Sequence, residues 1–351
     1  MERRAFLAAL AAGAAGASPR SVAGASPAAS SPPAGTVHTV RGPIDAARMG
    51  TTLVHEHVLV DFAGAEKVSR SRYDADEAFR TILPHLQELR GRGCDTLFEC
   101  TPAYLGRDPL LLRRLSEASG LHVVTNTGYY GAARDIAVPA HAYTETARQL
   151  AGRWTAEFRD GIEGTGIRPG FVKIGVDAGS LSEVDRKLVE AGALCHRDTG
   201  LTLAIHTGDG TAALEIAATL RRLDVSPEAW VWVHAQNADA TTRSWVAHGG
   251  GWVELDGVGP RSLDAHAAAV VDLFDRGQLD RVLVSQDAGW YRVGEEGGGS
   301  YRPHTLLFDA FLPALRARGL AQAQVEALLV RNPARAFAVR RRLSAPAGPP
   351  R

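Results

Sequence analysis

Short hydrophobic runs alternate with longer amphipathic stretches through the middle of the chain. Eight runs are rich in Val, Ile, Leu, Phe or Trp and lack regular polar alternation, which is typical of strands buried on both faces. They cover residues 53–61, 95–100, 122–127, 170–176, 201–206, 230–235, 251–256 and 281–287. Helix patterns lie between them, at residues 76–90, 183–199, 211–223 and 263–276, and one more begins at Asp108-Pro109, an N-cap followed by proline. Eight β-then-α units predict an α/β fold in a single domain, a (β/α)₈ TIM barrel.

Two features near the C-terminus are interpreted structurally. Asn332-Pro333-Ala334-Arg335 predicts the start of a final helix, with Asn332 as N-cap and Pro333 in the first position, and no catalytic role is expected for it. The arginine run at residues 340–342 is interpreted as a solvated helix end rather than a phosphate-binding patch.

The N-terminal segment has the features of an export signal. Arg3 and Arg4 precede a weakly hydrophobic Ala/Gly-rich stretch, and Ala23-Gly24-Ala25 offers a cleavage site. We expect residues 1–25 to be a twin-arginine signal to the periplasm or the cell exterior; a disordered Ala-rich extension is the alternative. Residues 26–36 are expected to form a flexible leader, 37–343 the barrel and 344–351 a disordered tail. The apolar run is too short to span a bilayer, so no membrane insertion is expected.

Composition narrows the class of protein. Hydrophobic residues make up 45% of the 351 residues and charged residues 22%, as in ordinary globular proteins. Basic and acidic residues balance at 39 each, so nothing indicates a nucleic-acid partner or a membrane surface. Three cysteines are too few for a disulfide framework, and Cys94 and Cys100 are expected to be buried thiols.

Residues that commonly bind metals recur where the predicted strands end, which is where the active site of a parallel barrel lies. His55 and His57 are two residues apart on the first strand and so face the same side, while Glu56 faces the helix layer. His206 ends the fifth strand, His234 the sixth and Asp287 the eighth. Each residue alone has an ordinary structural explanation as a hydrogen-bonding group.

Lys173 completes this set. It lies within the apolar Phe171-Val172-Lys173-Ile174 of the fourth strand. A strand lysine usually lies at a sheet edge, but this strand is predicted to be central, where a buried ammonium is costly. Four histidines, an aspartate and a buried lysine at one end of one barrel together predict a metal site.

Several ordered motifs resemble one known family. Thr52-Leu53-Val54-His55-Glu56-His57, the Phe-Val-Lys-Ile around Lys173, and the later His206, His234 and Asp287 resemble the phosphotriesterase family of the amidohydrolase superfamily. So do Gly106-Arg107-Asp108, Thr127-Gly128 before Tyr130, and Asn332-Pro333-Ala334-Arg335. The resemblance extends from about residue 37 to about residue 340.

The resemblance implies a role for each residue of the set. His55, His57 and Asp287 would hold the more buried of two divalent metal ions, and His206 and His234 the second. Lys173, carboxylated by CO₂, would bridge both as a carbamate, which replaces a stranded ammonium with an anion between two cations. Such ligands suit zinc, and also manganese, iron or cobalt.

Two such metals would lower the pKa of a shared water, giving a hydroxide that attacks an ester-like bond. The second metal would polarise the carbonyl or phosphoryl oxygen, and Asp287 would orient the hydroxide and accept its proton. The expected substrate is a small-molecule ester, lactone or phosphotriester. Dimers are common in the family, so a homodimer is the candidate assembly, although no segment marks an interface.

The sequence departs from the family pattern at two positions. Better-studied members carry a His or Arg directly after the Leu-Asp of strand seven, where this chain has Gly257. Phosphotriesterases carry an acidic residue three positions after the strand-six histidine, where this chain has Asn237. Those two positions form a proton relay in such enzymes, so we expect a different proton route here and poor organophosphate hydrolysis.

Four aromatic residues are candidates for the substrate pocket. Tyr130 falls where lactonases of the family place a tyrosine near the metals, and it is grouped with Asp287 and Lys173 as catalytic; a rim aromatic is the alternative. Tyr104 follows the second strand. The long loop at residues 288–305 carries Trp290 and Tyr291, which we expect to border the pocket, and its glycines 297–299 are expected to let it move as a lid. A surface loop with a packed tryptophan is the alternative.

We therefore expect a lactonase or carboxylic esterase with weak phosphotriesterase activity. A true phosphotriesterase is the first alternative, and the missing relay residues count against it. An amide-bond hydrolase would use the same two-metal chemistry. A non-catalytic metal-binding or sugar-binding barrel is the alternative from another class, and the complete set of six metal-site residues counts against it.

Overall fold

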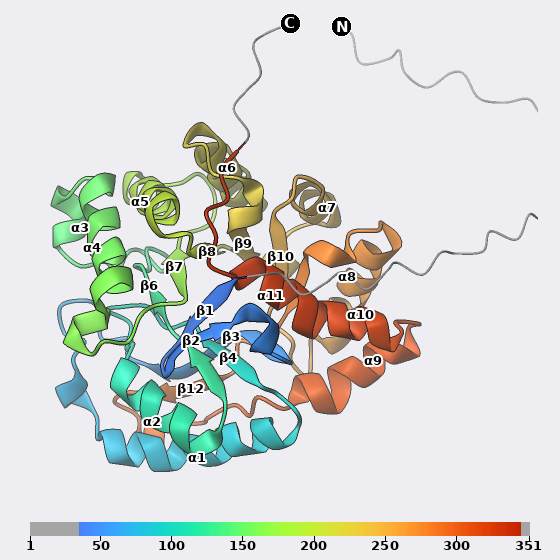
Figure 1. The fold of residues 1–351 in the computed structure, drawn as a ribbon, viewed down its shortest axis with the longest axis horizontal. Coiled ribbons are helices and arrows are strands. Elements are labelled where there is room, and N and C mark those ends of the chain that lie inside the picture. The colour runs from blue at the N-terminus through green and yellow to red at the C-terminus, as the bar shows by residue number, and fades with distance from the viewer. Residues whose placement is uncertain (1–34, 345–351) are drawn as a thin grey trace, which may run out of the picture. The chain divides into compact units, whose positions relative to one another are not determined.

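The computed structural model describes residues 35–344, and these form a closed parallel barrel (Figure 1). One sheet has the order β12-β3-β4-β5 and the other β6-β7-β8-β9-β10-β11, with every pair parallel. Because β5 and β6 are successive parts of one strand, and β11 and β12 of another, the two sheets join into a single ring. The strands are β3 (Thr52–Val60), β4 (Thr96–Glu99), β5 (His122–Val124), β6 (Asn126–Thr127), β7 (Phe171–Gly175), β8 (Thr202–His206), β9 (Trp230–Val233), β10 (Trp252–Leu255), β11 (Val282–Val284) and β12 (Gly289–Arg292). The predicted (β/α)₈ fold is confirmed.

Helices surround the strands in Figure 1. Their bounds are α1 (Ala75–Gly91), α2 (Pro109–Ser119), α3 (His141–Thr144), α4 (Ala147–Asp160), α5 (Glu183–Thr199), α6 (Gly210–Arg222), α7 (Ala240–His248), α8 (Leu263–Asp275), α9 (Leu312–Ala317), α10 (Gln322–Glu326) and α11 (Asn332–Phe337). The predicted cap of α2 is confirmed, because the Asp108 carboxylate accepts hydrogen bonds from the backbone N–H groups of Leu110 and Leu111.

The predicted N-cap role of Asn332 is wrong. A π-helical turn at Ala327–Arg331 joins α10 to α11, so Asn332 lies inside a continuing helix with φ −66° and ψ −47°. Its amide instead donates to the carbonyls of Leu279 and Val282, which ties this helix to the start of β11. The wide π turn precedes Pro333, whose missing N–H could not have extended a regular ladder.

The interpretation of residues 340–342 as a solvated helix end is also wrong for one arginine. The run follows the end of α11, and Arg342 is buried. Its guanidinium donates to the carbonyls of Arg335, Ala336 and Ala338, which satisfies acceptors left free at the end of α11. Arg340 and Arg341 are exposed.

Two hydrophobic cores stabilise the barrel. The outer core packs the strands against the helices. The inner core fills the barrel and includes Phe98, Phe171 and Phe337; the Phe337 ring centroid lies 4.3 Å from that of Phe98 and 5.8 Å from that of Phe171. An antiparallel hairpin of β1 (Thr36–Thr39) and β2 (Gly42–Asp45) contributes Val37 to this core and, with α11, covers the N-terminal ends of the strands. The opposite end is left for polar side chains.

The described residues settle some smaller expectations. Cys94, Cys100 and Cys195 are buried free thiols. Strand β1 begins at Thr36, one residue before the predicted start of the barrel. None of the helices within residues 35–344 has the length and apolar character needed to cross a membrane. The predicted export signal, residues 26–34 of the predicted leader and residues 345–351 of the predicted tail lie outside the described residues.

Candidate metal centre

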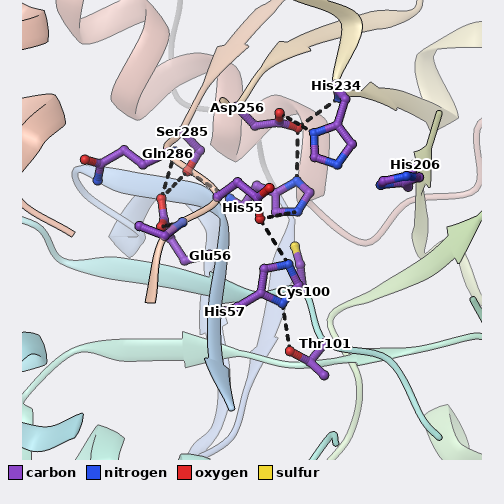
Figure 2. A network of polar contacts seen from close by, with 12 residues as sticks. His55, Glu56, His57, Cys100, Thr101, His206, His234, Asp256, Ser285 and Gln286 are labelled. Atoms are coloured by element: carbon purple, nitrogen blue, oxygen red, sulfur yellow. Dashed lines mark hydrogen bonds and ion pairs between the residues drawn. The ribbon is translucent and has the colours of Figure 1, made fainter. Parts of the chain in front are cut away.

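Strand β3 presents alternate side chains to opposite faces, which separates its two histidines from the glutamate between them. Figure 2 shows His55 and His57 on one side of the strand and Glu56 on the other, toward Ser285 and Gln286. Both histidines are buried, with 1% and 5% of their surface exposed. Their ring centroids lie 5.4 Å apart, so one ion can lie within reach of both.

Each of three histidines is oriented through its Nδ1 atom. His55 Nδ1 lies 2.8 Å from Glu254 Oε1, His57 Nδ1 lies 2.8 Å from Thr101 Oγ1, and His234 Nδ1 lies 2.6 Å from Asp256 Oδ1. Asp256 also accepts from the His234 backbone N–H, at 2.9 Å. Such partners fix the rotation of a metal-binding imidazole and leave its Nε2 lone pair free for the ion.

Asp287 brings a carboxylate to these free Nε2 atoms. Its Oδ1 lies 3.2 Å from His57 Nε2 and 3.7 Å from His55 Nε2. Atoms of His55, His234 and Asp287 lie within 4.8 Å of one another, a spacing that could hold a metal ion. Asp287 and His234 both have left-handed backbones, with φ of 51° and 63°. Non-glycine residues adopt this conformation at a cost, which is common at functional sites.

His206 and Tyr130 extend the same group. The His206 and His234 ring centroids are 4.3 Å apart. The Tyr130 hydroxyl lies 3.0 Å from His206 Nε2, and the two rings meet edge to face at 5.0 Å. The structure thus brings the predicted tyrosine into contact with one of the four histidines.

The burial of Lys173 has no structural explanation unless an ion or ligand binds beside its amine. It lies on β7 with 1% of its surface exposed, and its Nζ has no hydrogen-bond partner among the described residues. An unpaired buried amine costs about 1–3 kcal/mol when it is neutral and more when it is charged. Native proteins therefore rarely contain one. A carbamate held by cations would remove this cost.

The protonation of three of the four histidines fits metal binding as well. Burial, together with the Lys173 charge, lowers the pKa of His55 to about 4. Burial likewise lowers the pKa values of His57 and His206. These rings are therefore neutral at pH 7, which is the form that binds metals. The donor set, the orphaned amine and the neutral rings together fit divalent metal ions.

Comparison with known proteins agrees with this geometry. The sequence pattern of the Phosphotriesterase family matches residues 35–337. The chain belongs to this family. It is similar to the phosphotriesterase homology protein of Escherichia coli K12, with 30% identity over 82% of this chain and 98% of the relative. It is also similar to the aryldialkylphosphatase of Saccharolobus solfataricus, with 24% identity over 84% of this chain and 96% of the relative.

A solved structure gives the same result. A mutant of the PTE-like lactonase of Deinococcus radiodurans aligns with a TM-score of 0.77 and 28% identity, over 86% of this chain and all of that one. As a member of the phosphotriesterase family, the chain is a metal-dependent hydrolase that acts on ester-type bonds.

Sequence reasoning missed the carboxylates that orient the histidines. Glu254 and Asp256 are both buried and both contact His55 Nδ1. The signal was present, because Trp-Val-Glu-Leu-Asp places two acidic residues on the same face of a central strand. Thr101, which follows β4 and contacts His57, gave no comparable signal.

The two departures from the family pattern have a structural counterpart. A side chain at Gly257 would have its Cβ 2.7 Å from Gln236 Nε2 and 3.3 Å from His266 Nε2, so these two residues occupy that space. Gln236 uses its amide to donate to Asp256 Oδ1, at 2.8 Å. Asn237 is exposed.

The structure separates the other predicted pocket residues. The Trp290 ring lies 4.1 Å from that of His57, and its indole N–H donates to the Asp287 carbonyl at 2.7 Å. Tyr291 faces the other side of β12 and is buried in the outer core, so it does not lie with the metal-site residues. Tyr104 packs on Tyr129, 5.4 Å away between ring centroids, outside the histidine group.

The loop after β11 is more ordered than its glycine content suggested. Its first part is β12, which pairs with β3, and Gly289 forms an isolated bridge with Arg302. Residues 297–299 have φ values of 59°, 79° and 71°, which only glycine adopts readily. The turn geometry alone therefore accounts for these three glycines.

Proposed function

We propose that this protein hydrolyses lactones and related carboxylic esters, with weak activity on phosphotriesters. The contact between Tyr130 and His206 carries this proposal, because it puts a hydroxyl at the edge of the metal site. Burial raises the pKa of Tyr130, so the hydroxyl keeps its proton and can donate to a ring or carbonyl oxygen. The similarity to a PTE-like lactonase supports the same substrate class.

The proposal includes two divalent metal ions, with zinc as the first choice. His55, His57 and Asp287 would hold one, His206 and His234 the other, and carboxylated Lys173 would join them. When bound, the ions supply a Lewis acid for the substrate and acidify a water molecule. Asp287 would accept the proton released, since its carboxylate is already 3.2 Å from His57 and partly open to solvent.

The first test compares γ- and δ-lactones with paraoxon as substrates of the Zn- or Mn-loaded protein, with Lys173→Ala as the blank. We expect lactones to give a much higher kcat/KM, and the blank to be inactive. Tyr130→Phe should lower kcat/KM for lactones about 10- to 100-fold, and Tyr129→Phe, which removes a hydroxyl bonded to His141 instead, is the matched control.

The other outcomes separate the alternatives. Faster turnover of paraoxon would contradict the proposal and favour a true phosphotriesterase, as the similarity to an aryldialkylphosphatase would suggest. No turnover of any ester or amide by a metal-loaded protein would favour a binding barrel. Asp287→Asn should abolish turnover while the protein stays folded if the barrel is an enzyme.

We also propose export through the twin-arginine route. The support is Arg3-Arg4 followed by a weakly hydrophobic stretch and a small-residue cleavage site. The double substitution Arg3→Lys with Arg4→Lys should keep the protein in the cytoplasm of a bacterial host, as measured by fractionation. Unchanged export would contradict the proposal.

A further inference from the structure

Glu56 uses its whole carboxylate to hold one short backbone segment. It is fully buried. Its Oε1 accepts from Ser285 Oγ at 2.7 Å and from the Gln286 N–H at 3.0 Å. Its Oε2 accepts from the Ala288 N–H at 2.8 Å and contacts His304 Nδ1 at 3.0 Å. Three of these four partners lie in residues 285–288.

That segment contains Asp287, and its two neighbours are the residues whose N–H groups Glu56 holds. Asp287 has a φ of 51°, which needs support from its surroundings. Its own N–H donates to the His55 carbonyl at 3.1 Å. Its carbonyl accepts from Trp290 and from Arg302, at 2.7 and 3.0 Å. The Gln286 carbonyl accepts from Arg302 at 3.1 Å, and the Ala288 carbonyl accepts from the His57 N–H at 2.9 Å. Every backbone polar group from Gln286 N to Ala288 O is therefore paired, and Glu56 accepts from the N–H groups on both sides of Asp287.

His304 contacts Glu56 on the side of β3 that faces away from His55 and His57. It is fully buried, its Nε2 lies 3.0 Å from the Tyr301 hydroxyl, and its backbone carbonyl accepts from the Gln286 side chain. The same Gln286 side chain accepts from the Leu307 N–H at 2.8 Å. The carboxylate of Glu56 thus lies in a rigid polar network that reaches the loop after β12.

We propose that Glu56 is a positioning residue, which sets the place of the Asp287 carboxylate by fixing the backbone on both sides of it. Glu56 would then support the same metal ion as His55 and His57, but it would do so through residues 285–288 between β11 and β12. The inference rests on the proposed metal site, because it concerns how Asp287 is presented to the ion.

Glu99 offers a matched control. It lies directly opposite Glu56 in the pairing of β3 with β4 and is equally buried. Its Oε1 accepts from the N–H groups of Val58 and Thr101, and neither residue lies in the segment 285–288. Glu99→Gln therefore repeats the chemical change in the same layer without touching residues 285–288.

The experiment is a double-mutant cycle on Zn²⁺ affinity, measured by competition with a chromophoric chelator. We expect Glu56→Gln to weaken Zn²⁺ binding about 10- to 100-fold, as the loss of an outer partner of a metal ligand typically does. In an Asp287→Asn background the same change should cost less than about twofold, because the two substitutions act through one carboxylate. Glu99→Gln should change the affinity by the same factor in both backgrounds, because its contacts lead to Thr101, which orients His57, and not to Asp287.

A second readout avoids dependence on affinity alone. The visible absorption of the Co²⁺-loaded protein reports ligand geometry. This spectrum should differ between wild type and Glu56→Gln. It should be the same for Asp287→Asn and for the double variant that carries both substitutions. If Glu56→Gln does not fold, Glu56→Asp, which keeps the charge and retracts it, should show the same coupling.

Three results would overturn parts of the argument. An equal loss of affinity in both backgrounds would mean that Glu56 supports the fold in general. Unchanged affinity in Glu56→Gln would refute the positioning role and leave the metal site intact. A wild-type protein that binds no Zn²⁺ or Co²⁺ would refute the metal site itself, and with it the proposed function.

Discussion

The candidate metal ligands at this site depend on the buried carboxylates that contact them. His55 and His234 share Asp256, which contacts the Nδ1 atoms of both at 3.1 and 2.6 Å. Burial lowers the pKa of His55, whereas for His234 burial is outweighed by Asp256, which raises the pKa. Asp256 raises the pKa of both rings but outweighs burial only at His234, so the two histidines cannot be understood without the carboxylate that they share.

Glu99 gives a pH prediction at this scale. Burial raises its pKa from 4.5 to about 7, so the folded chain keeps a proton that the unfolded chain loses. Stability from this group is complete below pH 4.5 and is lost as pH rises through 7, by up to roughly 3.5 kcal/mol at about 1.4 kcal/mol per pKa unit. Glu99→Gln cannot ionise. Its free energy of unfolding, relative to wild type, should rise between pH 5 and pH 8 in urea titrations, and a pH-independent difference would contradict this.

The sequence indicated the candidate metal ligands better than the residues that contact and orient them. His55, His57, His206, His234 and Lys173 were recognisable because histidine at strand ends and lysine in an apolar strand are unusual. Glu254, Asp256 and Thr101 were not, because their roles depend on which strands become neighbours in the barrel. Tyr130 and Trp290 contact His206 and His57, whereas strand alternation turns Tyr291 outward into the outer core.

At the scale of elements, the last strand of the barrel is divided into β11 and β12, which pair with different neighbours. Strand β11 pairs with β10, and β12 pairs with β3, while residues 285–288 between them carry Asp287. The sequence predicted one strand followed by a long loop, because the glycines at 289, 294 and 297–299 obscure the pattern of β12. The resumed pairing after Asp287 closes the barrel beside the metal site.

Gly289 is the position where this arrangement is tightest. A Cβ there would lie 1.7 Å from the His57 carbonyl oxygen, and the residue has a φ of 96°. Gly294 has a similar φ of 93° but no atom within 4 Å of such a Cβ. Gly294→Ala should cost only the backbone strain, about 1–2 kcal/mol. Gly289→Ala should cost more than about 4 kcal/mol.

Chemical unfolding of both variants measures this difference, since backbone strain alone would make them equal. Equal losses would show that β12 shifts away from β3 without penalty. The Gly289 variant should also lose the contact between the Trp290 and His57 rings, which tryptophan fluorescence can follow.

The whole molecule keeps packing and chemistry at opposite ends. The β1–β2 hairpin and α11 lie at the N-terminal ends of the strands, and the histidine group lies at the other end. The alternation of strands and helices was enough to predict this division, because it specifies a parallel barrel. The hairpin and the π turn at Ala327–Arg331 were not predicted.

Those two ends meet. The Val339 N–H donates to the Thr36 carbonyl at 2.9 Å, directly beside the inner core. The hairpin and α11 therefore act as a clasp that joins the first unit of the barrel to the last. In a ring closed in this way, only the order of synthesis decides which unit comes first. A circularly permuted gene that joined β1 to the end of α11 and opened another helix–strand loop would therefore encode the same barrel, with the histidine group at the same end.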